Sequence, residues 1–186
     1  MSNIATDLKN ALSSVVSGVG DVYGTVRDVA KETVVTTLKA GGEVVTTTEE
    51  TIADVVSEGV KATSDTGVSL VQSVTGLVSG VIEGVKEAGL NLEEATIAAA
   101  EGAIKGTKEV GGDVGETAVA TVDGAIKAAG EIGEDSGNLA KDAVIGVLKA
   151  ADEIGSETGT LARKALLNAA ALPHDVIDAL LTGKTE

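Results

Sequence analysis

The stretch Lys127-Ala-Ala-Gly-Glu-Ile-Gly133 returns 22 residues later as Lys149-Ala-Ala-Asp-Glu-Ile-Gly155, with one change. The preceding stretch, Asp123-Gly-Ala-Ile-Lys127, repeats Glu101-Gly-Ala-Ile-Lys105 at the same distance. Three earlier residues continue the spacing, with a glutamate at the one position that lacks a lysine: Lys39, Lys61 and Glu83. The recurrence indicates an internal repeat, which is the signature of arrays built from one supersecondary unit.

The repeat length predicts helices. Twenty-two is twice eleven, and eleven residues make three helical turns at about 3.67 residues per turn. In the unit that begins at Lys105, the apolar face recurs at spacings of three and four, at Thr107, Val110, Val114, Ala118, Thr121 and Ala125. This spacing places side chains along one helix face, and the period-2 alternation of a strand is absent.

We therefore predict an all-α fold of elongated amphipathic helices, stacked as a bundle, a hairpin array or a filament. The repeat array is expected over residues 19–170. An N-terminal segment (1–18) precedes it, and a C-terminal short helix and tail (171–186) follow it, with the short helix expected at Pro173–Leu181 because proline suits a first helical turn.

Small residues dominate the predicted contact face. The packing face is predicted to contain Val110, Val114, Ala118, Ala125, Ala129, Ile132, Ala151 and Ile154. Glycines for close approach of helices are predicted from G-x-x-x-G spacing, at Gly76, Gly80, Gly84, Gly111, Gly115, Gly133, Gly137, Gly155 and Gly159. Two other interpretations stay open: helices that fold only on a surface, and helix breaks, best placed at Gly41-Gly42 and Gly111-Gly112.

The opposite face is charged. Lysine and acid alternate there as i,i+4 pairs, which predict ion pairs within one helix at Lys105–Glu109, Lys127–Glu131 and Lys149–Glu153. The acids could instead bind divalent cations, but such sites need more converging oxygens than one helix stripe offers. A solvated outer face is the simpler interpretation.

Composition excludes several classes of function. A net charge of −15 disfavours nucleic acid as a partner. The chain has no cysteine, its one histidine is His174, and no G-x-S-x-G or phosphate-binding motif occurs. We expect no enzyme, no cofactor and no metal site. The longest uncharged run, Thr66–Ile82, is short for a membrane span. The N-terminal residues do not show the pattern of a secretory signal, so a cytoplasmic protein is expected, with attachment to a membrane or lipid surface as the alternative.

Three stretches resemble known repeat units: Thr66-Gly-Val-Ser-Leu-Val71, Glu83-Gly-Val-Lys-Glu-Ala88 and Lys105-Gly-Thr-Lys-Glu-Val110. They are similar to 11-residue-repeat amphipathic helix proteins, namely perilipins, synucleins, exchangeable apolipoproteins and group 3 late embryogenesis abundant proteins. The likeness is one of pattern and composition. It implies helices that coat lipid surfaces or protect cells during drying. This chain is more acidic than the lipid-coating members and has more paired glycines, which favours helix-on-helix packing.

The sequence thus leads first to a non-catalytic structural protein that self-assembles through closely packed small-residue faces. Its expected partner is a second copy or another helical protein. A peripheral coat on membranes or lipid droplets is one alternative. A stress-protective protein that folds on drying is the other.

Overall fold

A computed structural model describes the chain except residues 1, 17–19, 41–47, 171, 174–175 and 177–186. Helices make up the described part, and no strand occurs in it. The helices are α1 (Ser2–Val16), α2 (Val22–Ala40), α3 (Thr48–Ser64), α4 (Leu70–Ala88), α5 (Leu92–Glu109), α6 (Val114–Ile132), α7 (Ser136–Ile154) and α8 (Ser156–Asn168). The prediction of an all-α fold is confirmed. The proposed break at Gly41-Gly42 and most of the helix predicted at Pro173–Leu181 lie outside the described residues.

Each 22-residue unit forms one helix and one turn. The five helices α3 to α7 begin at residues 48, 70, 92, 114 and 136, which is the spacing of the sequence repeat. The residue before four of them caps the helix, because its side chain accepts a hydrogen bond from the backbone N–H three residues later. These caps are Ser69, Asn91, Asp113 and Asp135, again 22 residues apart.

Glycine ends the helices at the same spacing. Gly133, which follows α6, has φ 73°, a left-handed conformation that costs glycine little because it has no Cβ. Equivalent glycines with φ between 71° and 75° follow the neighbouring helices at Gly67, Gly89 and Gly111. The prediction that Gly111 marks a helix break is confirmed.

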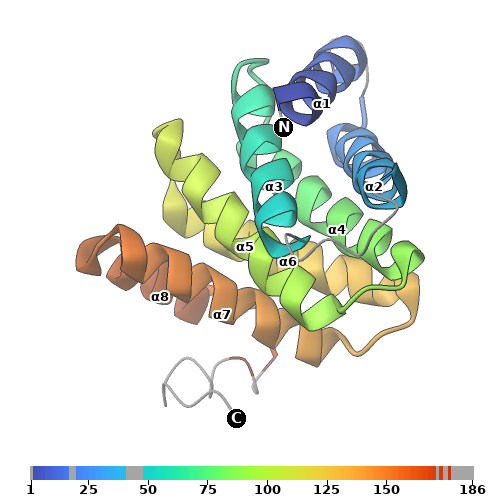
Figure 1. The fold of residues 1–186 in the computed structure, drawn as a ribbon. Helices are drawn as coiled ribbons and strands as arrows, with labels where there is room; N and C mark the ends of the chain where they lie inside the picture. Colours follow the sequence, from blue (N-terminus) through green and yellow to red (C-terminus); the bar gives the residue numbers. More distant parts are fainter. Residues whose placement is uncertain (1, 17–19, 41–47, 171, 174–175, 177–186) are drawn as a thin grey trace.

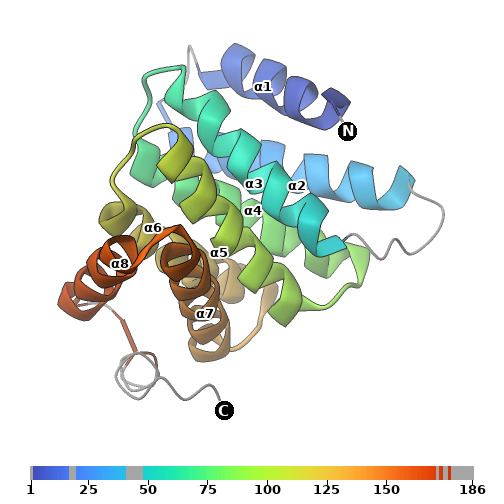
Figure 2. The same ribbon diagram turned by 60° about the vertical axis from the view of Figure 1, so that its left-hand side comes forward.

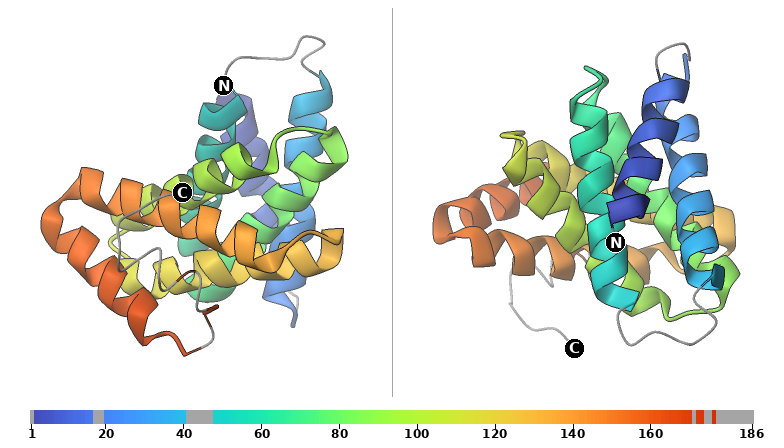
Figure 3. Two further views of the ribbon diagram at one scale, coloured as in Figure 1. Left: turned by 90° about the horizontal axis from the view of Figure 1, so that it is seen from below. Right: turned by 45° about the horizontal axis from the view of Figure 1, so that its top comes forward.

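The helices form two layers, shown in Figures 1 and 2. Helices α1, α3, α5 and α7 make one layer, and α2, α4, α6 and α8 make the other. Helices of a layer are neighbours in space although a complete helix of the other layer separates them in sequence. Figure 3 shows that α3, α5 and α7 run in successively different directions, so the layer twists. The predicted stacking of helices is therefore present within a single chain.

Close contacts between alternate helices depend on glycines at a second 22-residue spacing. A Cβ added at Gly124 of α6 would lie 2.7 Å from the carbonyl oxygen of Thr75 in α4. Gly80, Gly102 and Gly146 face the backbone of the helix two positions earlier in the same way. Gly102 faces Ala53 and Gly106 faces Ser57, so contacts advance in the same direction along α5 and α3. The two helices are therefore parallel.

The core is built from small aliphatic side chains. Alanine and valine supply most of the buried residues, with Leu77, Ile82 and Ile104 among the larger ones. Glycine brings the helix axes close enough for these short side chains to fill the space between them, which explains how the chain packs without Phe or Trp.

Candidate functional site

The predicted packing face lies inside the array. Val114, Ala118, Ala125, Ala129 and Ala151 are buried. The remaining members, Val110, Ile132 and Ile154, are half-buried and pack against the same core. These residues contact other helices of their own chain, so the small-residue face is already covered in one molecule.

The predicted close-approach glycines divide into two groups. Gly76, Gly80 and Gly84 of α4 face the backbone oxygens of Tyr23, Arg27 and Lys31 in α2. Gly115 lies near α8, where an added Cβ would be 3.2 Å from Ala165.

The prediction of close approach is wrong for the other five glycines. Gly111, Gly133 and Gly155 end helices, and an added Cβ would meet no atom within 4 Å. Gly137 faces only the cap residue Asp135, and Gly159 faces the side chains of Asp152 and Arg163. G-x-x-x-G spacing misled here because a helix end and the following first turn also place glycines four apart.

Four glycines that were not predicted from the sequence also approach the backbone of a neighbouring helix: Gly102, Gly106, Gly124 and Gly146. The signal was the 22-residue recurrence of Gly80, Gly102, Gly124 and Gly146. That recurrence separates glycines at helix contacts from glycines at helix ends, which follow their own 22-residue series.

The charged face forms ion pairs between helices. The acids expected to pair within their own helices instead contact earlier helices. Glu109 pairs with Lys61 and Glu153 with Lys105, in each case two helices earlier. Glu131 of α6 pairs with Arg27 of α2, four helices earlier. The i,i+4 pairs predicted with lysine first do not occur among the described residues. Lysines contact an acid four residues before them, as in Lys127–Asp123 at 2.9 Å, because helix side chains lean toward the N-terminus.

Several ion pairs join residues that are 48 positions apart, which is two repeats plus about one helical turn. Lys149 donates to Glu101 at 2.8 Å, and Lys39–Glu87, Lys61–Glu109, Lys86–Glu134 and Lys105–Glu153 share that separation. The charged face therefore joins alternate helices on the outside of the stack, as glycine does on the inside.

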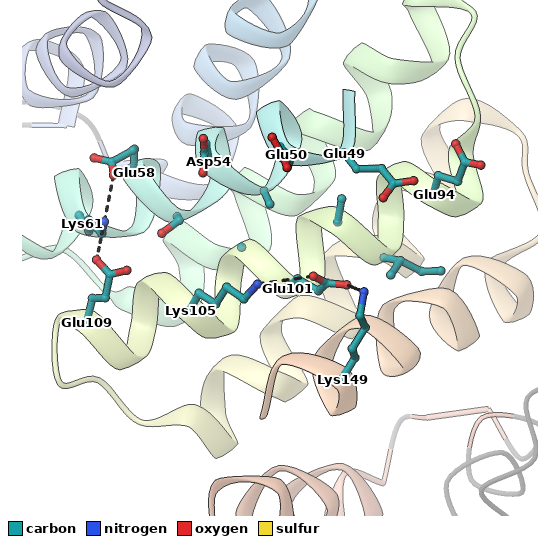
Figure 4. A pocket seen from close by; sticks show the side chains of 15 residues that line it. Glu49, Glu50, Asp54, Glu58, Lys61, Glu94, Glu101, Lys105, Glu109 and Lys149 are labelled. Atoms are coloured by element: carbon teal, nitrogen blue, oxygen red, sulfur yellow. Dashed lines mark hydrogen bonds and ion pairs between the residues drawn. The ribbon is translucent and has the colours of Figure 1, made fainter. Parts of the chain in front are cut away.

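A groove of about 610 Å³ runs along the layer of α3, α5 and α7 (Figure 4). Seven acidic side chains line it, against three lysines. Each lysine is engaged: Lys61 by Glu58 and Glu109, and Lys105 and Lys149 by Glu101. Among the described residues, the remaining four acids form no ion pair: Glu49, Glu50, Asp54 and Glu94. At longer range, the charge of Glu49 adds to the effect of Glu101 in raising the pKa of Lys149.

A second polar cluster joins α2, α4 and α6. Glu83, which replaces lysine in the repeat, is 7% exposed and accepts a hydrogen bond from Ser79 at 3.2 Å. Arg27 and Lys31 lie 3.9 Å and 3.7 Å from its carboxylate. Burial, and then the neighbouring Glu131, raise the pKa of Glu83 above its usual range. Tyr23 donates to or accepts from Ser79 at 3.2 Å, and its ring lies beneath Lys127. We assign this cluster to holding the three helices together.

A third feature lies between the first turns of α5 and α7. Asp142 lines a hollow together with Glu93, Glu134 and Asp135. Burial raises the pKa of Asp142 to about 6, with a smaller contribution from the charge of Glu93. Within the described part of the chain, no group of three or more acidic or histidine side chains is arranged to hold a metal ion.

No described helix combines the length and the apolar character needed to cross a membrane. Large apolar side chains exposed on the described surface are Val71, Leu161 and Leu167. His174 lies outside the described residues.

Comparison with known proteins supports the architecture. The chain superimposes on the crystal structure of a de novo designed helical repeat protein with a TM-score of 0.54, at 16% sequence identity, over 98% of this chain and 97% of that one. At this identity the likeness concerns the fold alone. No family model matches the sequence, and no curated protein matches it. The chain has the fold of a stacked helical repeat protein.

Proposed function

We propose that this chain is a non-catalytic structural scaffold, in which closely packed small-residue faces hold a helical array together and leave its outer surface for a protein partner. The observation that carries the proposal is the recurring contact of a glycine with the backbone of the helix two positions earlier, at Gly80, Gly102, Gly124 and Gly146. Stacked repeats of this kind gain their stability from neighbouring units and use their extended surface for binding.

The partner would meet the charged surface. The small-residue faces are covered by neighbouring helices of the same chain, so a second copy or another helical protein would contact the outer side chains instead. A lipid coat needs a long apolar face. The three large apolar residues exposed on the described surface do not make one, since Val71 belongs to α4 while Leu161 and Leu167 belong to α8.

Far-UV circular dichroism of the purified protein, with and without lipid vesicles, tests the proposal. We expect high helicity in plain buffer, cooperative thermal unfolding, and no change when vesicles are added, because the array completes its own core. A chain that is coil in buffer and becomes helical only on vesicles would contradict the scaffold and restore the lipid-coat interpretation.

A further inference from the structure

We propose that the groove along α3, α5 and α7 binds a lysine- and arginine-rich segment of a partner protein. The inference rests on the proposed scaffold function and names the chemistry of the partner. It is carried by two independent features of the groove: the placement of its unpaired carboxylates, and the hydroxyl of a nearly buried serine that no described residue uses.

The unpaired carboxylates occupy one end of the groove on both of its walls. Figure 4 shows Glu49, Glu50 and Asp54 in a row along α3, with Glu94 of α5 beside Glu49. First-turn acids interact favourably with the helix dipole, which accounts for Glu49, Glu50 and Glu94 singly. It does not account for Asp54, which lies farther along α3.

Ser57 supplies the second feature. This residue is 9% exposed and lines the groove. Its hydroxyl has no hydrogen-bond partner among the described residues. In the described part of the chain the fully buried side-chain oxygen without a partner is that of Thr96, so the Ser57 oxygen is open to the groove that it lines. A hydroxyl left open toward a groove is therefore available to a ligand.

The spread of the charges favours an extended cationic chain over a single ion. Glu50 and Asp54 are one helical turn apart on α3, about 6 Å, and Glu94 stands on the other wall. Within the described residues the acids do not converge as a metal site requires. In an extended peptide, successive side chains point to opposite sides, and side chains on the same side are about 7 Å apart. Lys and Arg side chains of such a peptide can therefore reach both walls.

Fluorescence anisotropy with a fluorescein-labelled (Arg-Lys-Gly)4 peptide tests the inference on the full chain. We expect the triple variant Glu50→Gln, Asp54→Asn, Glu94→Gln to weaken binding about tenfold at physiological salt, because close charges across an interface contribute directly to affinity. Ser57→Ala should weaken it about threefold with no change in charge.

A matched control removes the same number of charges elsewhere. Glu32, Glu116 and Glu157 are exposed, lie outside the groove, and have no ion-pair partner among the described residues. Glu116 also occupies the same repeat position as Glu94. Changing all three to glutamine should alter affinity by less than about twofold, since separated surface charges are screened.

Three outcomes would overturn the inference: equal weakening by both triple variants, no binding by the unmodified chain, or displacement of the peptide by micromolar calcium chloride. The first would mean attraction by the acidic surface as a whole, and the third would assign the groove to a cation. Circular dichroism of the same samples separates the two proposals. Helical protein that does not bind contradicts the groove alone, whereas a coil contradicts the scaffold.

Discussion

Two glycines six residues apart in α6 illustrate how position decides the role of a residue. Gly124 is buried, and an added Cβ would lie 2.7 Å from a backbone oxygen of α4. Gly130 is exposed, and an added Cβ would meet nothing within 4 Å. Gly124 lies in the middle of α6 and Gly130 in its last turn. Within a helix, glycine is up to about 1 kcal/mol less favourable than alanine. Only at Gly124 is this loss of stability offset, because the glycine allows α6 to pack closely against α4.

We expect Gly124→Ala to destabilise the protein by about 1–3 kcal/mol, because the added methyl group forces α6 away from α4. Gly130→Ala should stabilise it by up to about 1 kcal/mol, because helix propensity improves with no steric cost. Urea denaturation of the two variants gives both values. If both substitutions stabilise the protein equally, α4 and α6 do not approach as closely as the structure indicates.

At the scale of the element, the units of α4, α5 and α6 repeat the same plan. A cap residue such as Asp113 begins the helix, a glycine brings it against the helix two positions earlier, and a left-handed glycine such as Gly133 ends it. Lysine and acid on the outer face then join the same pair of helices at the 48-residue spacing. Each of these units therefore contacts the helix two positions earlier through glycine on the inside and through ion pairs on the outside.

The contact between α5 and α7 should depend on pH through Asp142. Its pKa is raised from 3.8 to about 6, first by burial and then by Glu93, while Lys141 acts in the opposite direction. Because the folded-state pKa is higher than the unfolded one, the protonated carboxyl contributes stability at low pH, and this contribution is lost as pH rises through 6.

We expect the unmodified chain to lose about 1 kcal/mol of stability between pH 5 and pH 7.5 relative to Asp142→Asn. The variant should thus be the more stable protein at neutral pH, by an amount that shrinks on acidification. Urea denaturation at several pH values measures the difference. If the free energies of unfolding of the two proteins change with pH in parallel, the carboxyl group of Asp142 is not desolvated in the folded protein.

For the whole molecule, stability resides in contacts between units. Helices of one layer are parallel neighbours separated in sequence by a helix of the other layer. Because the cap, the two glycine series and the ion pairs all recur at 22 residues or its multiples, a complete unit can be removed without changing the character of the remaining contacts.

Deletion of residues 92–113 removes one unit and joins Asn91, itself a cap residue, to the first residue of α6. We expect this shortened chain to keep cooperative unfolding and a helix content per residue close to that of the full chain. Deletion of residues 103–113 alone should abolish cooperative unfolding, because it removes half a unit together with the turn. A long amphipathic helix with an 11-residue period would tolerate both deletions equally, so circular dichroism during thermal unfolding distinguishes the two architectures.

The sequence by itself determined the helical class, the 22-residue unit and the small-residue character of the core. A spacing of three and four residues defines one helix face regardless of what covers it, and residues such as Ala118 and Ala129 accordingly lie in the interior. Those features are local, so a one-dimensional pattern contains them.

Only the tertiary structure decided which helices meet and what each glycine does. Gly111 and Gly102 look alike in sequence, yet one ends a helix and the other lies against α3. Glu109 similarly pairs with Lys61, 48 residues away, in place of the lysine four residues before it. The physical reason is that backbone approach and ion pairing depend on distances between helices, and these are fixed when the array folds into two layers. The groove and its unpaired carboxylates exist only because three alternate helices lie side by side.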